Sequence, residues 1–232
     1  RVGYPVADTV GGMTAAFAVA ALNGTPRGSF IDVSMLESVL ATMGWVVSNH
    51  LIAGVEPTAN GNENATSAPS GAFQAGGGLI NIAANKDEQW ELLANHLHLS
   101  HLCENPDYAT REMRKENRQA LKAELEAVLQ TRPARDWAKE LNRIGVPAGA
   151  VLTVPEILEM PQVADRGFLK EFENVPGVDR DIQVATTGIK LDGVAPTTDA
   201  PPPLLGEHNE QIWGDLGLSE VELKNLKEGG AI

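Results

Sequence analysis

The stretch "YPVADTVGGMTAAFAVAALNG" (residues 4–24) decides the fold, because it sets one carboxylate, Asp8, ahead of two glycines and a long run of small apolar residues. The run predicts a helix that begins at Gly11 or Gly12 and ends at Asn23. Asp8 is then either the N-cap, whose oxygen accepts a backbone N–H of the first turn, or a functional carboxylate beside glycines that let a ligand approach the backbone closely. The spacing alone does not separate these two interpretations.

The next sixty residues (25–84) predict a strand, a helix, a polar connection and a hairpin. "SFIDV" (29–33) predicts a short strand, and Ser34 with Glu37 forms an S-x-x-E capping box before a helix that buries one broad apolar face. The polar residues 55–70 predict a domain boundary or a functional loop. "GAFQA" and "LINIAA", separated by Gly76 to Gly78, predict a hairpin with a tight glycine turn.

Helices dominate the rest of the predicted structure. We expect Asn85 and Glu88 to cap a helix over 87–97, and Thr110 to begin a long helix whose alternating charges form a solvated outer face. A further helix from Thr131 to Gly145 precedes a strand in "VPAGAVLTV" (146–154). Extended runs and turns follow, and the chain ends in two helices, the second capped by Ser219 and Glu222.

Composition excludes several classes of protein. The 232 residues suffice for one large or two small domains, and the net charge of −13 argues against a nucleic-acid partner. The apolar stretches fall short of the ~20 residues that cross a bilayer, so no membrane span is expected. A single cysteine, Cys103, indicates a reducing, cytoplasmic compartment. Because the sequence begins at Arg1, we expect it to be the inner part of a longer polypeptide.

His96, His98, His101 and Cys103 crowd one segment without the spacing of a metal site. Neighbours two apart near a helix end do not share a face, and no second ligand pair exists, so we expect no metal. A Cys103 nucleophile with His101 as its base meets the same objection.

Several motifs together resemble one family. "VADTVGGMTAAFAVAAL" followed by "GSFIDVSMLESVL", then "APSGAFQAGGGLINIAANKDEQW", "VPAGAVLTVPEILEMPQVADRG" and "APPPLLGEHNEQI", resemble segments of the class III CoA-transferases in the same order. The resemblance spans essentially the whole chain. It implies an α/β fold, with part of a Rossmann-like large domain (residues 1–60 and 181–232), a smaller α+β domain (61–180), and an interlocked homodimer.

The resemblance also implies a site. Asp8 matches the catalytic aspartate, which attacks an acyl-CoA thioester and passes coenzyme A to a carboxylic acid through a mixed anhydride. Met35 falls where the family contacts CoA, although it equally fits a core position. Thr66, Ser67 and Ala68 fall where formyl-CoA transferase carries a mobile glycine-rich loop, and the glycines are absent here.

The family's basic contacts to CoA phosphates come from a Rossmann-like region before the aspartate. Residues 1–110 carry only three Lys and Arg residues, Arg1, Arg27 and Lys86, so we expect the phosphates to be bound by an N-terminal region of the same polypeptide that precedes this sequence.

Two alternatives stay open. A 2-methylacyl-CoA racemase shares the fold and uses its aspartate as an acid or base. Racemase-like chains tend to carry Glu where this one has Asp87, which favours transfer. The chain is otherwise a non-catalytic interaction module in which Asp8 is only a cap.

Overall fold

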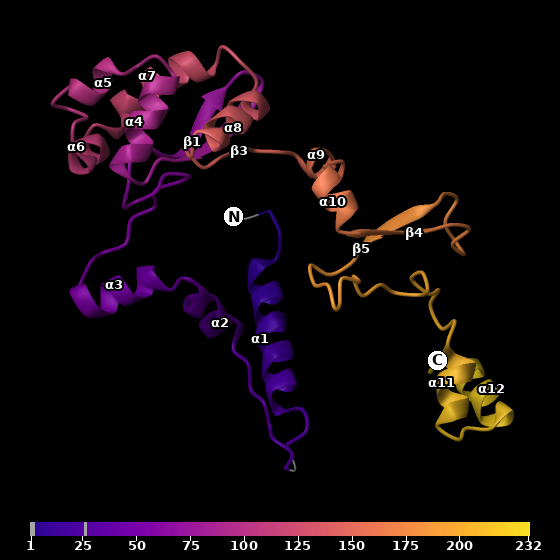
Figure 1. The fold of residues 1–232 in the computed structure, drawn as a ribbon. Coiled ribbons are helices and arrows are strands. Elements are labelled where there is room, and N and C mark those ends of the chain that lie inside the picture. The colour runs from indigo at the N-terminus through magenta and orange to yellow at the C-terminus, as the bar shows by residue number, and fades with distance from the viewer. Residues whose placement is uncertain (1–2, 26) are drawn as a thin grey trace. The chain divides into compact units, whose positions relative to one another are not determined.

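The computed structural model describes residues 3–25 and 27–232 as a mixture of helices and short strands (Figure 1). The chain divides into two compact units. One consists of Arg1–Ala72 and Ile82–Glu124, and the other of Phe73–Asn81 and Leu125–Ile232.

The first helix, α1, spans Val6–Leu22 and so begins five residues before Gly11, where the sequence predicted its start. Its N-cap is Pro5, which makes no side-chain capping bond, so the interpretation of Asp8 as the N-cap is wrong. Gly11 is buried, and a Cβ atom there would lie 3.0 Å from Cγ of Met35. Gly11 therefore serves the contact between α1 and the next helix, rather than a helix start.

Two helices follow where one was predicted: α2 (Met35–Thr42) and α3 (Trp45–Ala53). Ser34 Oγ accepts a hydrogen bond from the backbone N–H of Glu37 at 3.2 Å, which confirms the N-cap. The helix breaks at Gly44, whose φ of 49° favours glycine. The predicted broad buried face is wrong, since Leu36 is 69% exposed and Ser38 is the one buried residue of α2.

The predicted strand over 29–33 is not formed. These residues have no regular secondary structure and pair with no strand in the described part of the chain. A β-prone run needs a neighbouring strand to become one, because its hydrogen bonds are made between strands.

The predicted hairpin is confirmed. Strands β1 (Ser70–Ala75), β2 (Gly78–Ala83) and β3 (Ala148–Ala150) form a sheet in that order, which also confirms a strand within 146–154. The backbone N–H of Gly76 donates to the carbonyl of Arg132 at 2.9 Å, and a Cβ at Gly76 would lie 2.7 Å from that oxygen. This close approach requires glycine.

Five helices follow β2 and precede β3 along the chain. They are α4 (Asp87–His96), α5 (His101–Glu104), α6 (Arg111–Glu116), α7 (Arg118–Leu129) and α8 (Ala134–Arg143). Thr110 caps α6 as predicted, but the long helix is divided at Asn117. The predicted cap of Asn85 with Glu88 is wrong: the N-cap of α4 is Lys86, and the Gln89 side chain accepts hydrogen bonds from the backbone N–H groups of Asn85 and Lys86. Much of the apolar core comes from these helices and strands: Ile80, Ile82, Leu93, Leu97, Leu121, Leu125 and Leu141.

The remaining elements are short. Helices α9 (Val154–Leu158) and α10 (Pro161–Asp165) precede strand β4 (Leu169–Phe172), which pairs antiparallel with β5 (Ile182–Ala185). The last helices are α11 (Asn209–Asp215) and α12 (Glu220–Glu228). The predicted capping box of Ser219 and Glu222 at α12 is confirmed. Among the described residues, no helix has the length and apolar character needed to cross a membrane.

Candidate active site

Asp8 lies in the first turn of α1 and its side chain is exposed. A carboxylate at this place lies near the positive end of the helix dipole. The N-cap residue Pro5 makes no side-chain capping bond, and the backbone N–H of Val6 donates to the Tyr4 carbonyl at 2.9 Å. The first turn of α1 thus presents the exposed carboxylate of Asp8.

The contact between α1 and α2 brings Met35 toward Asp8. Gly11 follows Asp8 by three residues, so the two share a face of α1. Gly11 packs against Met35, which is the first residue of α2. Met35 is 51% exposed, so in this chain it is not a core residue. Two of the predicted site residues therefore lie at the same end of the α1–α2 pair.

Thr66, Ser67 and Ala68 form a short segment directly before β1. The Asn64 side-chain oxygen accepts from both the N–H and the Oγ1 of Thr66 at 2.8 Å. Ser67 and Ala68 are buried, and Ser67 Oγ donates to the Asn85 carbonyl at 3.4 Å. The segment is therefore held by its own hydrogen bonds and by burial of two of its three residues.

Arg114 is the residue that the sequence analysis missed. It lies on α6, whose charges were predicted to be solvated, yet it is 1% exposed. Its Nε donates to the Ala68 carbonyl at 2.9 Å and its Nη1 to the Tyr108 carbonyl at 3.0 Å. Its Nη2 pairs with the carboxylate of Asp87, and its guanidinium lies 5.6 Å from the Trp90 ring centroid. The sequence held one signal: Asp87 is a carboxylate in the first turn of a neighbouring helix.

A second ion-pair group holds the chain just before this segment. Glu63 pairs with Arg118 at 3.0 Å and with Lys122 at 3.2 Å. Arg118 Nη2 also donates to the Asn64 carbonyl at 2.7 Å. The carbonyl of Ala68, at the end of the segment, and the carbonyl of Asn64, two residues before its start, thus accept hydrogen bonds from arginine side chains of α6 and α7.

The histidine-rich segment does not form a metal centre in the part of the chain that the structure describes, where no group of three or more potential ligands is found. His96 ends α4 and His101 begins α5. Burial and the nearby charge of Glu91 raise the pKa of the Cys103 thiol above its ordinary value. A thiol with a raised pKa carries less thiolate at neutral pH, so this environment does not activate Cys103 as a nucleophile.

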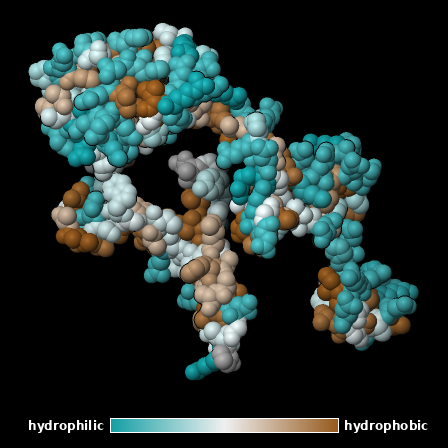
Figure 2. All heavy atoms as spheres, in the orientation of Figure 1, coloured by the Kyte–Doolittle hydropathy of each residue, from teal (hydrophilic) through white to brown (hydrophobic). Residues whose placement is uncertain are grey.

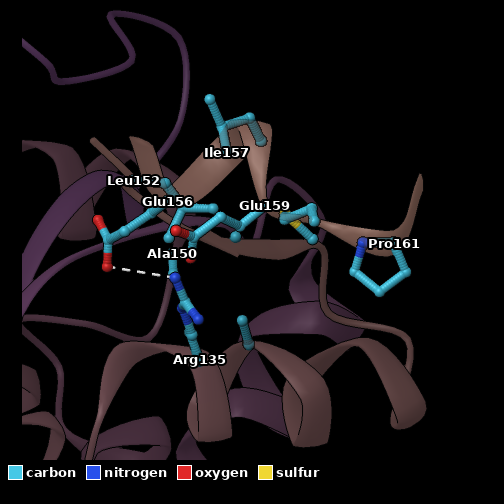
Figure 3. Close-up of a pocket in the computed structure, with 10 residues that line it drawn as sticks. Arg135, Ala150, Leu152, Glu156, Ile157, Glu159 and Pro161 are labelled. Carbon is cyan, nitrogen blue, oxygen red and sulfur yellow. Dashed lines mark hydrogen bonds and ion pairs between the residues drawn. The ribbon is translucent and has the colours of Figure 1, made fainter. Parts of the chain in front are cut away.

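The second compact unit contains a separate pocket of about 530 Å³ between α8, β3, α9 and α10 (Figure 3). Arg135 points across it and pairs with Glu156 at 3.2 Å. Glu156 also accepts from the N–H and the hydroxyl of Thr153 at 2.8 Å each, and these bonds lower the pKa of its carboxyl group. Because Arg135 already has a carboxylate partner, the pocket does not offer an unpaired cation to a phosphate.

Residues 1–209 match the sequence model of CoA-transferase family III. A match of this extent covers most of the chain, and the chain therefore belongs to that family.

Individual relatives agree with this assignment. Succinyl-CoA:mesaconate CoA-transferase of Haloarcula marismortui is 30% identical over 195 residues, which cover 84% of this chain and 48% of the relative. Succinyl-CoA–D-citramalate CoA-transferase of Chloroflexus aurantiacus is also 30% identical, over 98% of this chain and 58% of the relative. The crystal structure of a CaiB/BaiF family protein from Brucella suis has a TM-score of 0.79 and 27% identity, covering 93% of this chain and 56% of that chain. The chain spans about half the length of the curated relatives that it matches.

Proposed function

We propose that the protein transfers coenzyme A from an acyl-CoA donor to a carboxylic acid, with Asp8 as the nucleophile. The observation that carries this proposal is the exposed carboxylate of Asp8 in the first turn of α1, on the helix face where Gly11 meets Met35. Membership of CoA-transferase family III supports it, because a carboxylate is the group that such a transfer requires.

The reaction then proceeds in four steps. A carboxylate oxygen of Asp8 attacks the thioester carbonyl, the C–S bond breaks, and CoA leaves as thiolate, which gives a mixed anhydride. The thiolate attacks the Asp8 carbonyl of this anhydride, releases the donor acid and forms an aspartyl-CoA thioester. The acceptor carboxylate attacks the carbonyl of that thioester, the C–S bond breaks, and CoA leaves again as thiolate, which gives a second anhydride. The thiolate finally attacks the acceptor's acyl carbon, and Asp8 is regenerated as carboxylate.

The substrates follow from charge and from the relatives. We propose that Met35 contacts CoA and that Thr66, Ser67 and Ala68 line the substrate site. Basic residues are few before Arg111, so an N-terminal region of the same polypeptide is proposed to bind the CoA phosphates. The relatives' names mention succinyl-CoA with mesaconate or D-citramalate, and we propose a small dicarboxylic acid as acceptor here.

The assembly proposed is an interlocked homodimer in the cytoplasm, with α1 to α3 belonging to a Rossmann-like large domain. Large apolar side chains on these helices support a covering partner, since Phe17 is 77% and Ile52 is 86% exposed. The single cysteine of the sequence suits a reducing compartment.

The test is an assay of the full-length protein with succinyl-CoA and a panel of mono- and dicarboxylic acids, following the new acyl-CoA by mass spectrometry. We expect a new thioester with at least one dicarboxylate. Exchange of the α-proton of a 2-methylacyl-CoA, without any CoA transfer, would instead assign the racemase reaction. Neither activity, in a folded protein that binds CoA, would leave the interaction module as the function.

A further inference from the structure

The segment from Asn64 to Ala68 differs from a mobile loop in how completely it is bonded. Thr66 is held at both its N–H and its hydroxyl by Asn64, at 2.8 Å in each case. Ser67 is 4% exposed and Ala68 is fully buried. No glycine lies among these residues, so the backbone lacks the residue type that most widens its conformational range. The segment is built to keep one conformation.

Arg114 fixes the C-terminal end of this segment. A guanidinium presents five N–H donors in a rigid planar fork, and here three directions of the fork are used by three separate parts of the chain. Nε bonds the Ala68 carbonyl at 2.9 Å, Nη1 bonds the Tyr108 carbonyl at 3.0 Å, and Nη2 pairs with Asp87. A buried cation is costly unless it is paired and hydrogen-bonded, so its retention here points to a positional role.

Arg118 fixes the other end. Its Nη2 donates to the Asn64 carbonyl at 2.7 Å while its Nη1 pairs with Glu63 at 3.0 Å. The two arginines are four residues apart, on α6 and α7, so one short stretch of chain holds both ends of the segment.

We propose that Arg114 is a positioning residue for the acyl-transfer site: it holds Thr66, Ser67 and Ala68 as a fixed wall of that site rather than as a lid that opens. This inference rests on the proposed function, in which the segment lines the site. A fixed wall keeps water from the anhydride and from the aspartyl-CoA thioester. If the wall loosens, water attacks the thioester carbonyl, CoA leaves as the thiol, and Asp8 returns as carboxylate, so hydrolysis competes with transfer.

The principal variant is Arg114→Lys in the full-length protein, because lysine keeps the charge but its single ammonium cannot reproduce the fork. Arg111→Lys is the matched control. Arg111 lies on the same helix, is mostly exposed, and its recorded ion pair is a 3.8 Å contact with Glu112. We expect Arg114→Lys to raise the ratio of hydrolysis to transfer by about tenfold or more, whereas Arg111→Lys leaves it unchanged.

A second readout does not depend on activity. Amide hydrogen exchange, measured by mass spectrometry on the peptide covering 64–69, should accelerate about tenfold in Arg114→Lys while peptides from α12 stay unchanged. If Arg114→Lys does not fold, Asp87→Asn serves instead. It removes the charge partner, whose side chain is 71% exposed, and leaves both bonds to backbone carbonyls, so a smaller change of the same sign is expected.

Each outcome decides the proposal. Unchanged exchange over 64–69 shows that Arg114 does not hold the segment. Faster exchange with an unchanged ratio of hydrolysis to transfer, and unchanged KM for both substrates, shows that the segment is not part of the site. If the wild-type protein transfers no CoA, the proposed function has failed, and the exchange result reports separately whether Arg114 fixes the segment. Faster exchange together with a raised ratio confirms the proposal.

Discussion

The helices α1 to α3 and the central segment (residues 63–150) differ in the solvent exposure of their apolar side chains. Among the described residues, every buried apolar side chain lies at Ala68 or later in the chain. Helices α1 to α3 instead expose large apolar side chains, including Met13 at 68% and Phe17 at 77%. Figure 2 shows tan and brown residues along α1 and α3, while the visible face of the central segment is mainly teal.

The buried core that stabilises the chain lies in the central segment, whereas the proposed nucleophile lies in α1. In the central segment, the guanidinium of Arg114 is hydrogen-bonded and paired with Asp87, and apolar residues of α4, α7 and α8 are buried. Helices α1 to α3 carry the proposed nucleophile but leave an apolar surface that a soluble protein rarely exposes to this extent. Changes in α1 to α3 should therefore alter mainly activity and assembly. Changes to the buried apolar residues of the central segment should alter mainly stability.

The largest expected effect is on turnover. Asp8→Asn in the full-length protein should reduce CoA transfer by about 1,000-fold or more, or ~4 kcal/mol of barrier, because the amide is a far weaker nucleophile than the carboxylate. Steady-state kinetics and thermal unfolding check this, and the melting temperature should hardly move, since Asp8 is exposed and caps no helix. Retention of activity within about tenfold would remove Asp8 from the proposed role.

A matched pair of leucines tests the contrast in stability. Leu125 is fully buried and Leu36 is 69% exposed. Leu125→Ala should cost about 2–5 kcal/mol of unfolding free energy, whereas Leu36→Ala should stay within about 0.5 kcal/mol in this 232-residue chain. Urea unfolding of both variants measures the difference. Equal losses at the two positions would mean that α2 is already packed in this chain and that the contrast is false.

A pair of glycines sharpens the same contrast. Gly76→Ala places a Cβ 2.7 Å from the Arg132 carbonyl oxygen, so it should destabilise the protein by about 1–3 kcal/mol. Gly12→Ala, in α1, meets no atom within 4 Å and should stabilise the chain by up to about 1 kcal/mol through helix propensity. The denaturation midpoints of the Gly76→Ala and Gly12→Ala variants measure these two effects. A loss at Gly12 as large as that at Gly76 would show that the face of α1 at Gly12 is also packed in this chain, in addition to the contact that Gly11 makes with Met35.

The smallest effect concerns the thiol of Cys103. Because burial and the charge of Glu91 raise its pKa, it carries less thiolate than a free cysteine at any given pH near neutrality. Alkylation by iodoacetamide at pH 8 should therefore be several-fold slower than for free cysteine, and its rate should rise at higher pH. Faster alkylation than free cysteine would reopen Cys103 as a nucleophile.

Local signals predicted a good part of the fold. The hairpin followed from two β-prone runs separated by Gly76 to Gly78, and the start of α12 followed from Ser219 with Glu222. These predictions succeeded because turn chemistry and caps act within a few residues.

Long-range contacts account for what the sequence did not predict. The sequence predicts a helix start at Gly11 or Gly12. In the structure Gly11 lies inside α1 and packs against Met35, which is 24 residues later in the chain. Residues 29–33 are β-prone and lack a partner strand among the described residues. The charge pattern predicts a solvated face that includes Arg114. No local signal indicates that Arg114 donates a hydrogen bond to the Ala68 carbonyl, 46 residues earlier in the chain.

The most direct test of the central claim is chemical trapping at Asp8. The full-length protein is incubated with succinyl-CoA, quenched with hydroxylamine and digested, and the peptide that contains Asp8 is analysed by mass spectrometry. An activated aspartyl carbonyl, as anhydride or thioester, reacts with hydroxylamine to give a hydroxamate, whereas a free carboxylate does not. We expect a hydroxamate at Asp8 in the wild-type protein and none in Asp8→Asn. CoA transfer that proceeds in the wild-type protein with Asp8 unmodified would contradict it.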